Sequence, residues 1–197
     1  MSQLTSKILV KLSFACLAVA ASLVATPQLA QAEVLPRVLG LDAAVLVPVG
    51  ALSSTGGNGN GVGMSYAVFV RYEQKTAPNM SLTARLGGLR GSAKDSGLGS
   101  WALDAYSALV GGVYRLQPSS DGIFLSGEVG ANMVQFRAPN TTQNSTGAFE
   151  TKLGAVLGAG YRTDVLTFRA ALNLLDVSKA QDTMGVLISV GWDFKGL

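Results

Sequence analysis

The sequence predicts an all-β protein, specifically an eight-stranded antiparallel up-and-down transmembrane β-barrel. Three observations support this prediction: polarity alternates with a period of two along eight segments, long and short connections alternate strictly, and only 14% of the residues are charged. Soluble domains carry about 25% charged residues, so much of the surface is expected to face something other than water. A chain of 197 residues is long enough for one domain with a substantial core.

Residues 1–32 are predicted to be a secretory signal peptide that precedes the barrel at 33–197. Lys7 and Lys11 come before an apolar run, which ends in the cleavage-type tripeptide Ala-Gln-Ala. A retained membrane-anchor helix is the alternative, but the apolar run is short for that role. Cleavage would remove Cys16, the single cysteine, and would leave a nearly neutral chain with no charge-based reason to bind nucleic acid.

Eight segments of the remaining chain alternate large apolar residues with small or polar ones. Along residues 185–194, every even-numbered position is large and apolar, whereas the odd-numbered positions are mostly small or polar. Such alternation is typical of strands whose two faces meet different surroundings. The fourth segment is less regular around Asp104, which suggests a β-bulge. The predicted strands cover residues 38–49, 62–73, 80–90, 101–115, 123–136, 149–162, 165–175 and 185–194.

The connections between these segments alternate between long polar loops and short turns. Loops rich in Gly, Ser, Asn and Thr follow the first, third and fifth strands, and a long polar segment follows the seventh. Shorter connections follow the second, fourth and sixth strands. An up-and-down barrel in a bilayer has its turns on one side and its loops on the other, and strands of about 9 to 11 residues span the hydrocarbon. The large apolar faces are therefore expected to contact lipid, and the opposite faces to line a narrow polar interior.

Aromatic side chains near the short-turn ends of the strands are expected to form a girdle at one membrane interface. The alternative is that aromatic residues simply favour strands. Trp101 and Phe149 fall near the opposite rim. The predicted girdle residues are Tyr72, Tyr161, Phe168, Trp192 and Phe194.

Charged residues on or near the predicted interior faces are the one candidate site in the sequence. An uncompensated charge in a narrow lumen is costly, so opposite charges are expected to pair. Two interpretations follow: a closed plug of salt bridges, or a thin ion path lined by both signs. Eight strands leave an interior just wide enough for side chains to fill, which favours the plug. The residues are Asp42, Arg71, Glu73, Arg85, Asp104, Glu128, Glu150, Lys152, Arg162, Arg169 and Asp193.

The eight-strand pattern over 38–194 and the ending SVGWDF resemble the small outer-membrane β-barrel superfamily of Gram-negative bacteria, which includes the transmembrane domain of outer membrane protein A. Members commonly end on a strand with an aromatic last residue that is recognised during assembly, whereas here Lys195, Gly196 and Leu197 follow Phe194. The resemblance implies outer-membrane location, periplasmic chain ends, extracellular long loops, and contact with outer-membrane lipids and the barrel assembly machinery. It implies no single activity.

No catalytic, cofactor or metal site is expected. The chain has no histidine. Known outer-membrane barrel enzymes resemble one another in using a histidine for proton transfer near neutral pH. Cysteine and histidine ligands are absent from the mature part, and the acidic loop residues are scattered. We therefore expect a monomeric, non-enzymatic barrel with a structural or surface-interaction role through its long loops. The alternatives are a narrow pore for ions or small solutes, and a soluble periplasmic barrel with its large residues turned inward around a lipid.

Overall fold

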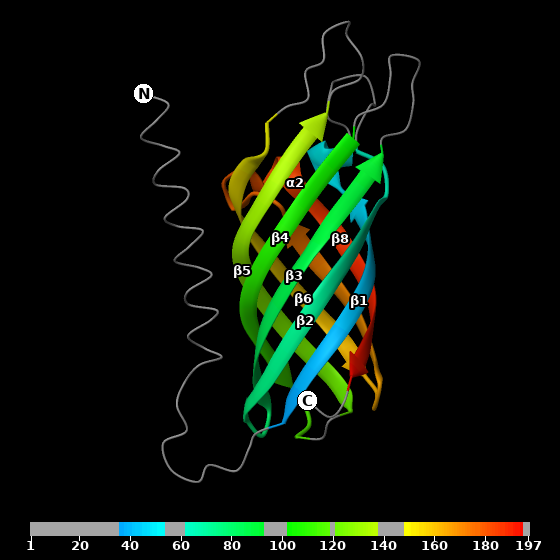
Figure 1. Cartoon of the computed structure of the whole chain (residues 1–197), viewed down its shortest axis with the longest axis vertical. Coiled ribbons are helices and arrows are strands. Elements are labelled where there is room, and N and C mark those ends of the chain that lie inside the picture. Colours follow the sequence, from blue (N-terminus) through cyan, green and yellow to red (C-terminus); the bar gives the residue numbers. More distant parts are fainter. Residues whose placement is uncertain (1–35, 54–61, 93–101, 119–120, 138–147, 195–197) are drawn as a thin grey trace, which may run out of the picture. The chain divides into compact units, whose positions relative to one another are not determined.

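The computed structural model describes residues 36–53, 62–92, 102–118, 121–137 and 148–194, which form a closed barrel (Figure 1). Each strand pairs antiparallel with its neighbours in sequence, and β1 closes the ring by pairing with β8. The predicted eight-stranded antiparallel up-and-down fold is therefore confirmed. The predicted signal peptide, Trp101 and the three residues after Phe194 lie outside the described residues. The strands are β1 Arg37–Pro48, β2 Ser65–Ala77, β3 Met80–Ser92, β4 Ala102–Arg115, β5 Gly122–Arg137, β6 Glu150–Arg162, β7 Leu166–Leu174 and β8 Met184–Phe194.

The strands differ from the sequence prediction in two places. β2 continues through Ala77, so only Pro78 and Asn79 connect it to β3, whereas the predicted turn began at Gln74. The pairing of β2 with β3 shifts register between Lys75 and Ala77, while β4 pairs without a shift on both sides. The bulge predicted in the fourth strand is therefore wrong, and the irregularity lies in β2.

The two ends of the barrel differ in how the strands are connected. The connections β1–β2, β3–β4, β5–β6 and β7–β8 lie at one end, here called the long-loop end, and the other three lie at the short-turn end. Three short elements belong to the long-loop end: the 3-10 turns η1 Gly50–Ser53 and η2 Val177–Lys179, and the helical turn α2 Ala180–Thr183 (Figure 1). Among the described residues, no helix is long and apolar enough to cross a membrane.

Asp176 begins the η2 turn and fixes the path of the β7–β8 connection. Its carboxylate accepts hydrogen bonds from the backbone N–H of Ser178 at 2.9 Å and from the Ser178 hydroxyl at 2.6 Å. These bonds favour the ionised form, so the pKa of Asp176 lies below its usual range. The Thr183 hydroxyl donates to the Asp176 carbonyl at 2.9 Å, and this bond joins the two ends of the β7–β8 connection.

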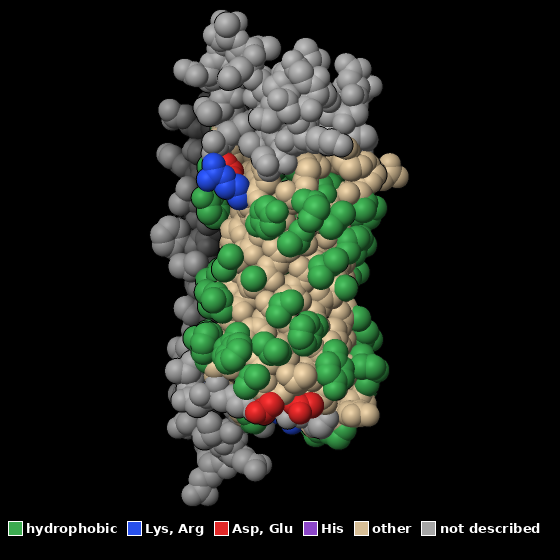
Figure 2. Space-filling view, turned by 90° about the vertical axis from the view of Figure 1, so that its right-hand side faces the viewer, with side chains coloured by type: hydrophobic (Ala, Val, Ile, Leu, Met, Phe, Trp, Pro, Cys, Tyr) green, Lys and Arg blue, Asp and Glu red, His purple; other side chains and the backbone are tan. Residues whose placement is uncertain are grey.

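The outer wall of the barrel is apolar. Large aliphatic side chains stand on it, among them Leu153 and Leu157, each 62% exposed. Figure 2 shows hydrophobic groups spread over the wall, while the charged groups in view lie near its upper and lower edges. A continuous apolar surface of this kind is stable only against apolar surroundings. The alternative of a soluble barrel with its large residues turned inward is wrong, because these side chains point outward.

The structure places the five predicted girdle residues on the outer wall toward the short-turn end. Tyr161 faces Phe168 across the β6–β7 pair, and Trp192 and Phe194 stand near the end of β8. All four are between 44% and 53% exposed, and Tyr72 is half-buried. Phe149 lies toward the opposite end, where its ring is 5.7 Å from that of Tyr106.

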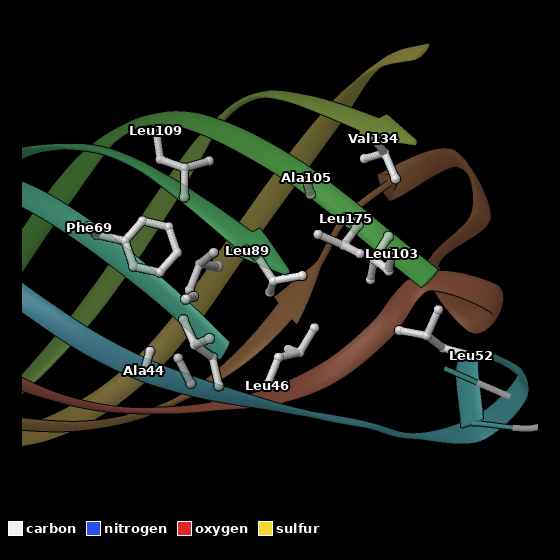
Figure 3. Close-up of a cluster of buried hydrophobic side chains, with 14 of the residues drawn as sticks. Ala44, Leu46, Leu52, Phe69, Leu89, Leu103, Ala105, Leu109, Val134 and Leu175 are labelled. Atoms are coloured by element: carbon white, nitrogen blue, oxygen red, sulfur yellow. The ribbon is translucent and has the colours of Figure 1, made fainter. Parts of the chain in front are cut away.

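The interior has two layers, and the one at the long-loop end is apolar (Figure 3). Leu46, Leu103 and Leu187 point inward with no more than 1% of their surface exposed, and Leu52 of η1 and Leu175 pack with them as part of the same cluster. The prediction of a polar interior is therefore wrong for this layer. Leu52 and Leu175 of the connections pack over the strand leucines, so side chains fill this layer as they fill the core of a soluble protein.

Placing a charge on the outer wall tests its contact with lipid. We expect Val190→Arg to lower the free energy of unfolding by about 2–4 kcal/mol, because Val190 stands on the outer face near the middle of β8 and a buried cation in hydrocarbon is poorly solvated. Urea unfolding of protein folded into lipid vesicles measures this, with Val190→Leu as the apolar control. Equal stability of the two variants would contradict a lipid-facing wall.

The apolar layer gives a second prediction. Leu103→Ala should cost about 2–5 kcal/mol, because the side chain is fully buried and its removal leaves a cavity. Leu157→Ala removes the same atoms from the outer wall, where lipid chains can fill the gap, so its cost in the same unfolding assay should be smaller. If the two losses are equal, the long-loop end of the interior is not packed as described.

Candidate functional site: the charged interior

The second layer of the interior, toward the short-turn end, is one connected group of ion pairs. It is here called the ion network, and it contains five guanidinium groups and four carboxylates. Every strand contributes at least one of them and β2 contributes two. The nine residues are Asp42, Arg71, Glu73, Arg85, Arg115, Glu128, Arg162, Arg169 and Asp193.

Arg85 joins the two layers. Its side chain has no exposed surface, and its terminal nitrogens donate to Asp42 at 3.0 Å and to Glu128 at 3.3 Å. The guanidinium also lies 4.4 Å from the centre of the Phe69 ring, a cation–π contact with the edge of the apolar layer. Glu128 in turn accepts from Arg169 at 3.0 Å, so a single carboxylate serves two cations from different strands.

Arg71 is the corresponding hub nearer the short-turn end. It contacts Asp42 at 3.3 Å, Glu73 at 3.4 Å and Asp193 at 2.5 Å. The Thr167 hydroxyl donates to Asp193 at 3.1 Å. Because a guanidinium has five N–H donors in a fixed plane, it can bind several carboxylates at once.

Glu73 completes the ion network at the short-turn end. It accepts from Arg162 at 2.6 Å and also from Arg115, which in turn donates to the Ser81 hydroxyl at 2.7 Å. The sequence prediction missed Arg115, although it stands two and six residues beyond the inward-facing Val113 and Leu109. The two-residue period of β4, carried to the end of the strand, was the signal that could have found it.

Glycines on β1 and β8 make room for the Arg71 ion pairs. A Cβ at Gly191 would stand 2.1 Å from a carboxylate oxygen of Asp42, and one at Gly40 would stand 2.7 Å from an Arg71 nitrogen. Both distances are too short for a methyl group. Glycine at these two positions therefore accommodates the Arg71 ion pairs and does not leave open space.

Three of the predicted interior charges lie elsewhere. Asp104 is on the outward face of β4, directly opposite Arg90 of β3, with 3.6 Å between the charged groups. The sequence assigned it to the wrong face, because the alternation of β4 is weak near its start. Glu150 and Lys152 continue the inward-facing series of β6 but lie at the long-loop rim, where they pair at 2.7 Å. Glu150 is exposed and Lys152 is half-buried, so neither is part of the ion network.

Very little open volume remains at the centre of the ion network. The cavity beside Arg71, Glu128 and Arg169 measures about 10 Å³, enough for about one water molecule. The Nε atoms of Arg85 and Arg169 are buried without a hydrogen-bond partner, and a water at this place could accept from Arg169. Among the described residues, no group of three Cys, Asp or Glu side chains gathers to hold a metal ion.

No family model matches the sequence, and no curated protein matches it. The structure is similar to Neisserial surface protein A, with a TM-score of 0.50 and 14% sequence identity over 81% of this chain and 97% of that one. The chain has the fold of the small eight-stranded outer-membrane barrels.

Two other structures resemble this outer-membrane barrel fold. Ail, the attachment invasion locus protein of Yersinia pestis, matches with a TM-score of 0.49 and 17% identity over 82% of this chain and 100% of that one. The N-terminal β-barrel domain of Pseudomonas aeruginosa OprF matches with a TM-score of 0.46 and 15% identity over 80% and 97%. At such identities the similarity extends to the fold alone.

Removing one carboxylate tests whether the ion network is integral to the barrel. We expect Glu128→Gln to lower the free energy of unfolding by about 3–5 kcal/mol, because Arg85 and Arg169 lose a shared partner in a buried site. Glu150→Gln is the matched control at the exposed rim and should leave the stability nearly unchanged. Urea unfolding of both variants in vesicles measures the difference. A small effect of Glu128→Gln would mean that water already solvates the interior charges.

Proposed function

We propose that this protein is a non-enzymatic outer-membrane barrel with a closed interior, and that it acts as a structural or surface-interaction protein through its long-loop end. The observation that carries the proposal is that two kinds of side chain fill the lumen. The ion network occupies the layer toward the short-turn end, and buried leucines occupy the layer above it. Together they favour the salt-bridge plug over a thin ion path.

The proposed placement in the membrane follows from the fold and the outer wall. An apolar wall on a closed eight-stranded barrel suits the outer membrane of a Gram-negative cell, with lipid as its principal contact. In this orientation the short-turn end and both chain ends face the periplasm, and the long loops face outward. We further propose that the signal peptide at 1–32 directs export, that the barrel assembly machinery inserts the chain, and that it remains a monomer.

The long-loop end offers ordered elements to a partner. Leu52 and Leu175 anchor the β1–β2 and β7–β8 connections in the apolar layer. Above them, Val177 is 41% exposed, and Lys179 and Asp182 are also exposed on η2 and α2. A surface held by buried leucines loses less conformational entropy on binding than a free loop does. This supports a binding role at this end without identifying the partner.

A role in catalysis has less support. The ionised groups of the interior are engaged in ion pairs with one another, and the chain has no histidine. A general base must have a free lone pair within reach of the substrate proton. Each carboxylate of the ion network is shared by two or three guanidinium groups.

Conductance measurements distinguish a closed barrel from a narrow pore. We expect the folded protein to give no stepwise currents in planar bilayers bathed in potassium chloride, because side chains fill the lumen. A shift in gel mobility on boiling verifies that the sample is folded, and a water-filled porin in the same bilayers verifies the sensitivity of the recording. Reproducible current steps that scale with the amount of folded protein would replace the closed barrel with the pore.

A further inference from the structure

A second cavity, at the short-turn end, has a volume of about 120 Å³. It is here called the short-turn cavity, and it lies at the opposite end of the barrel from the long loops. Its charged lining residues are Glu73, Lys75, Arg115, Arg162, Asp164 and Asp193, and Ser81 also lines it. The volume suits a small polyatomic anion in addition to water, whereas the 10 Å³ cavity inside the ion network does not.

The cavity wall carries three cations and three carboxylates, and the ion network that borders it carries one cation in excess. The ion network has five guanidinium groups and four carboxylates. Glu73 is shared by three guanidinium groups, and Asp193 is shared by two of the same three. A net charge held away from bulk water is costly unless an opposite charge offsets it.

Lys75 adds a further cation to the cavity wall. Within the described part of the chain its ammonium group has no carboxylate partner in an ion pair, and its backbone N–H donates to the Pro36 carbonyl at 3.2 Å. Asp164, the remaining acid of the wall, is exposed, so solvent screens its charge more strongly than the charges deeper in the cavity. The buried part of the cavity therefore presents donors in excess of acceptors.

Donor groups at the cavity are also arranged to hold oxygen atoms. Arg162 is 7% exposed and uses Nε and Nη2 for Thr167 and Glu73, and Arg115 uses its two terminal nitrogens for Ser81 and Glu73. Among the described residues, these contacts leave Nη1 of Arg162 and Nε of Arg115 as further N–H donors. The Ser81 hydroxyl accepts from Arg115 and so has its own O–H to donate.

We infer that the short-turn cavity binds a small oxyanion, a phosphate or a carboxylate group, through Lys75, Arg115 and Arg162. Guanidinium groups match the geometry of both kinds of oxyanion, and a bound anion offsets the excess positive charge of the ion network. Two sources share this chemistry: a free phosphate-type anion, and the carboxylate of a larger molecule. The inference concerns binding at the end opposite the loops and is independent of any loop partner.

Calorimetric titration of the full-length folded protein in an uncharged detergent tests the inference. Inorganic phosphate and acetate are the two probes, used separately and at constant ionic strength. We expect saturable binding of at least one probe, and about tenfold weaker binding by Lys75→Gln, because one charge-assisted hydrogen bond is lost. Lys179→Gln, at the long-loop end, is the matched control and should bind as the unmodified protein does.

The outcomes separate clearly. Tighter binding of phosphate supports a free phosphate-type anion, and tighter binding of acetate supports a carboxylate group as the ligand. The inference is overturned if neither probe binds saturably, if both lysine variants weaken binding equally, or if only Lys179→Gln weakens it. A mobility shift on boiling verifies that each variant is folded before it is titrated.

Discussion

The structure depends on one constraint: nine ionised side chains inside a barrel with an apolar exterior must find their partners in the interior. Each strand carries at least one of these groups, and the pairs run across the lumen as well as between neighbours. If a strand slipped by one residue, its charge would turn toward the apolar wall, at a cost of about 2–4 kcal/mol near the midplane. A slip of two residues would keep the face but separate the pairs. The ion network therefore specifies the register of the whole barrel, including the closing pair of β1 and β8.

The two layers of the interior have different physical roles. Buried ion pairs add little net stability, because desolvation offsets much of their attraction. The leucines toward the long-loop end contribute the ordinary stabilisation of a packed core. Arg85 connects the layers, since it binds Asp42 and Glu128 while its guanidinium lies against Phe69. Register is thus specified mainly by charge in one layer, and the other layer supplies most of the packing energy.

Because of these two layers, the two ends of the barrel also have different surfaces. At the long-loop end, leucines of the connections enter the apolar layer and hold η1, η2 and α2 in place. At the short-turn end, the ion network, which has one more guanidinium group than carboxylates, reaches a polar cavity. The first surface suits a macromolecular partner and the second suits a small anion. Between the two ends, the central cavity has no room for a solute larger than a water molecule.

The sequence by itself determined the number of strands, their approximate bounds and the apolar wall, because a period of two and the spacing of turn residues are local properties. It also identified eight of the nine residues of the ion network. It missed Arg115 and placed Asp104 on the wrong face, because a weak alternation leaves the phase of a strand undefined until its neighbours are paired.

Only the tertiary structure decided which charges meet and which part of the interior is apolar. Arg85 and Glu128 are 43 residues apart in sequence and come together through the closure of the barrel. The inward faces of β1 and β8 carry both leucine and aspartate, so composition alone could not divide the interior into an apolar and a charged layer. That division arises because the stagger of eight tilted strands brings the leucines of different strands to one level and the charges to another.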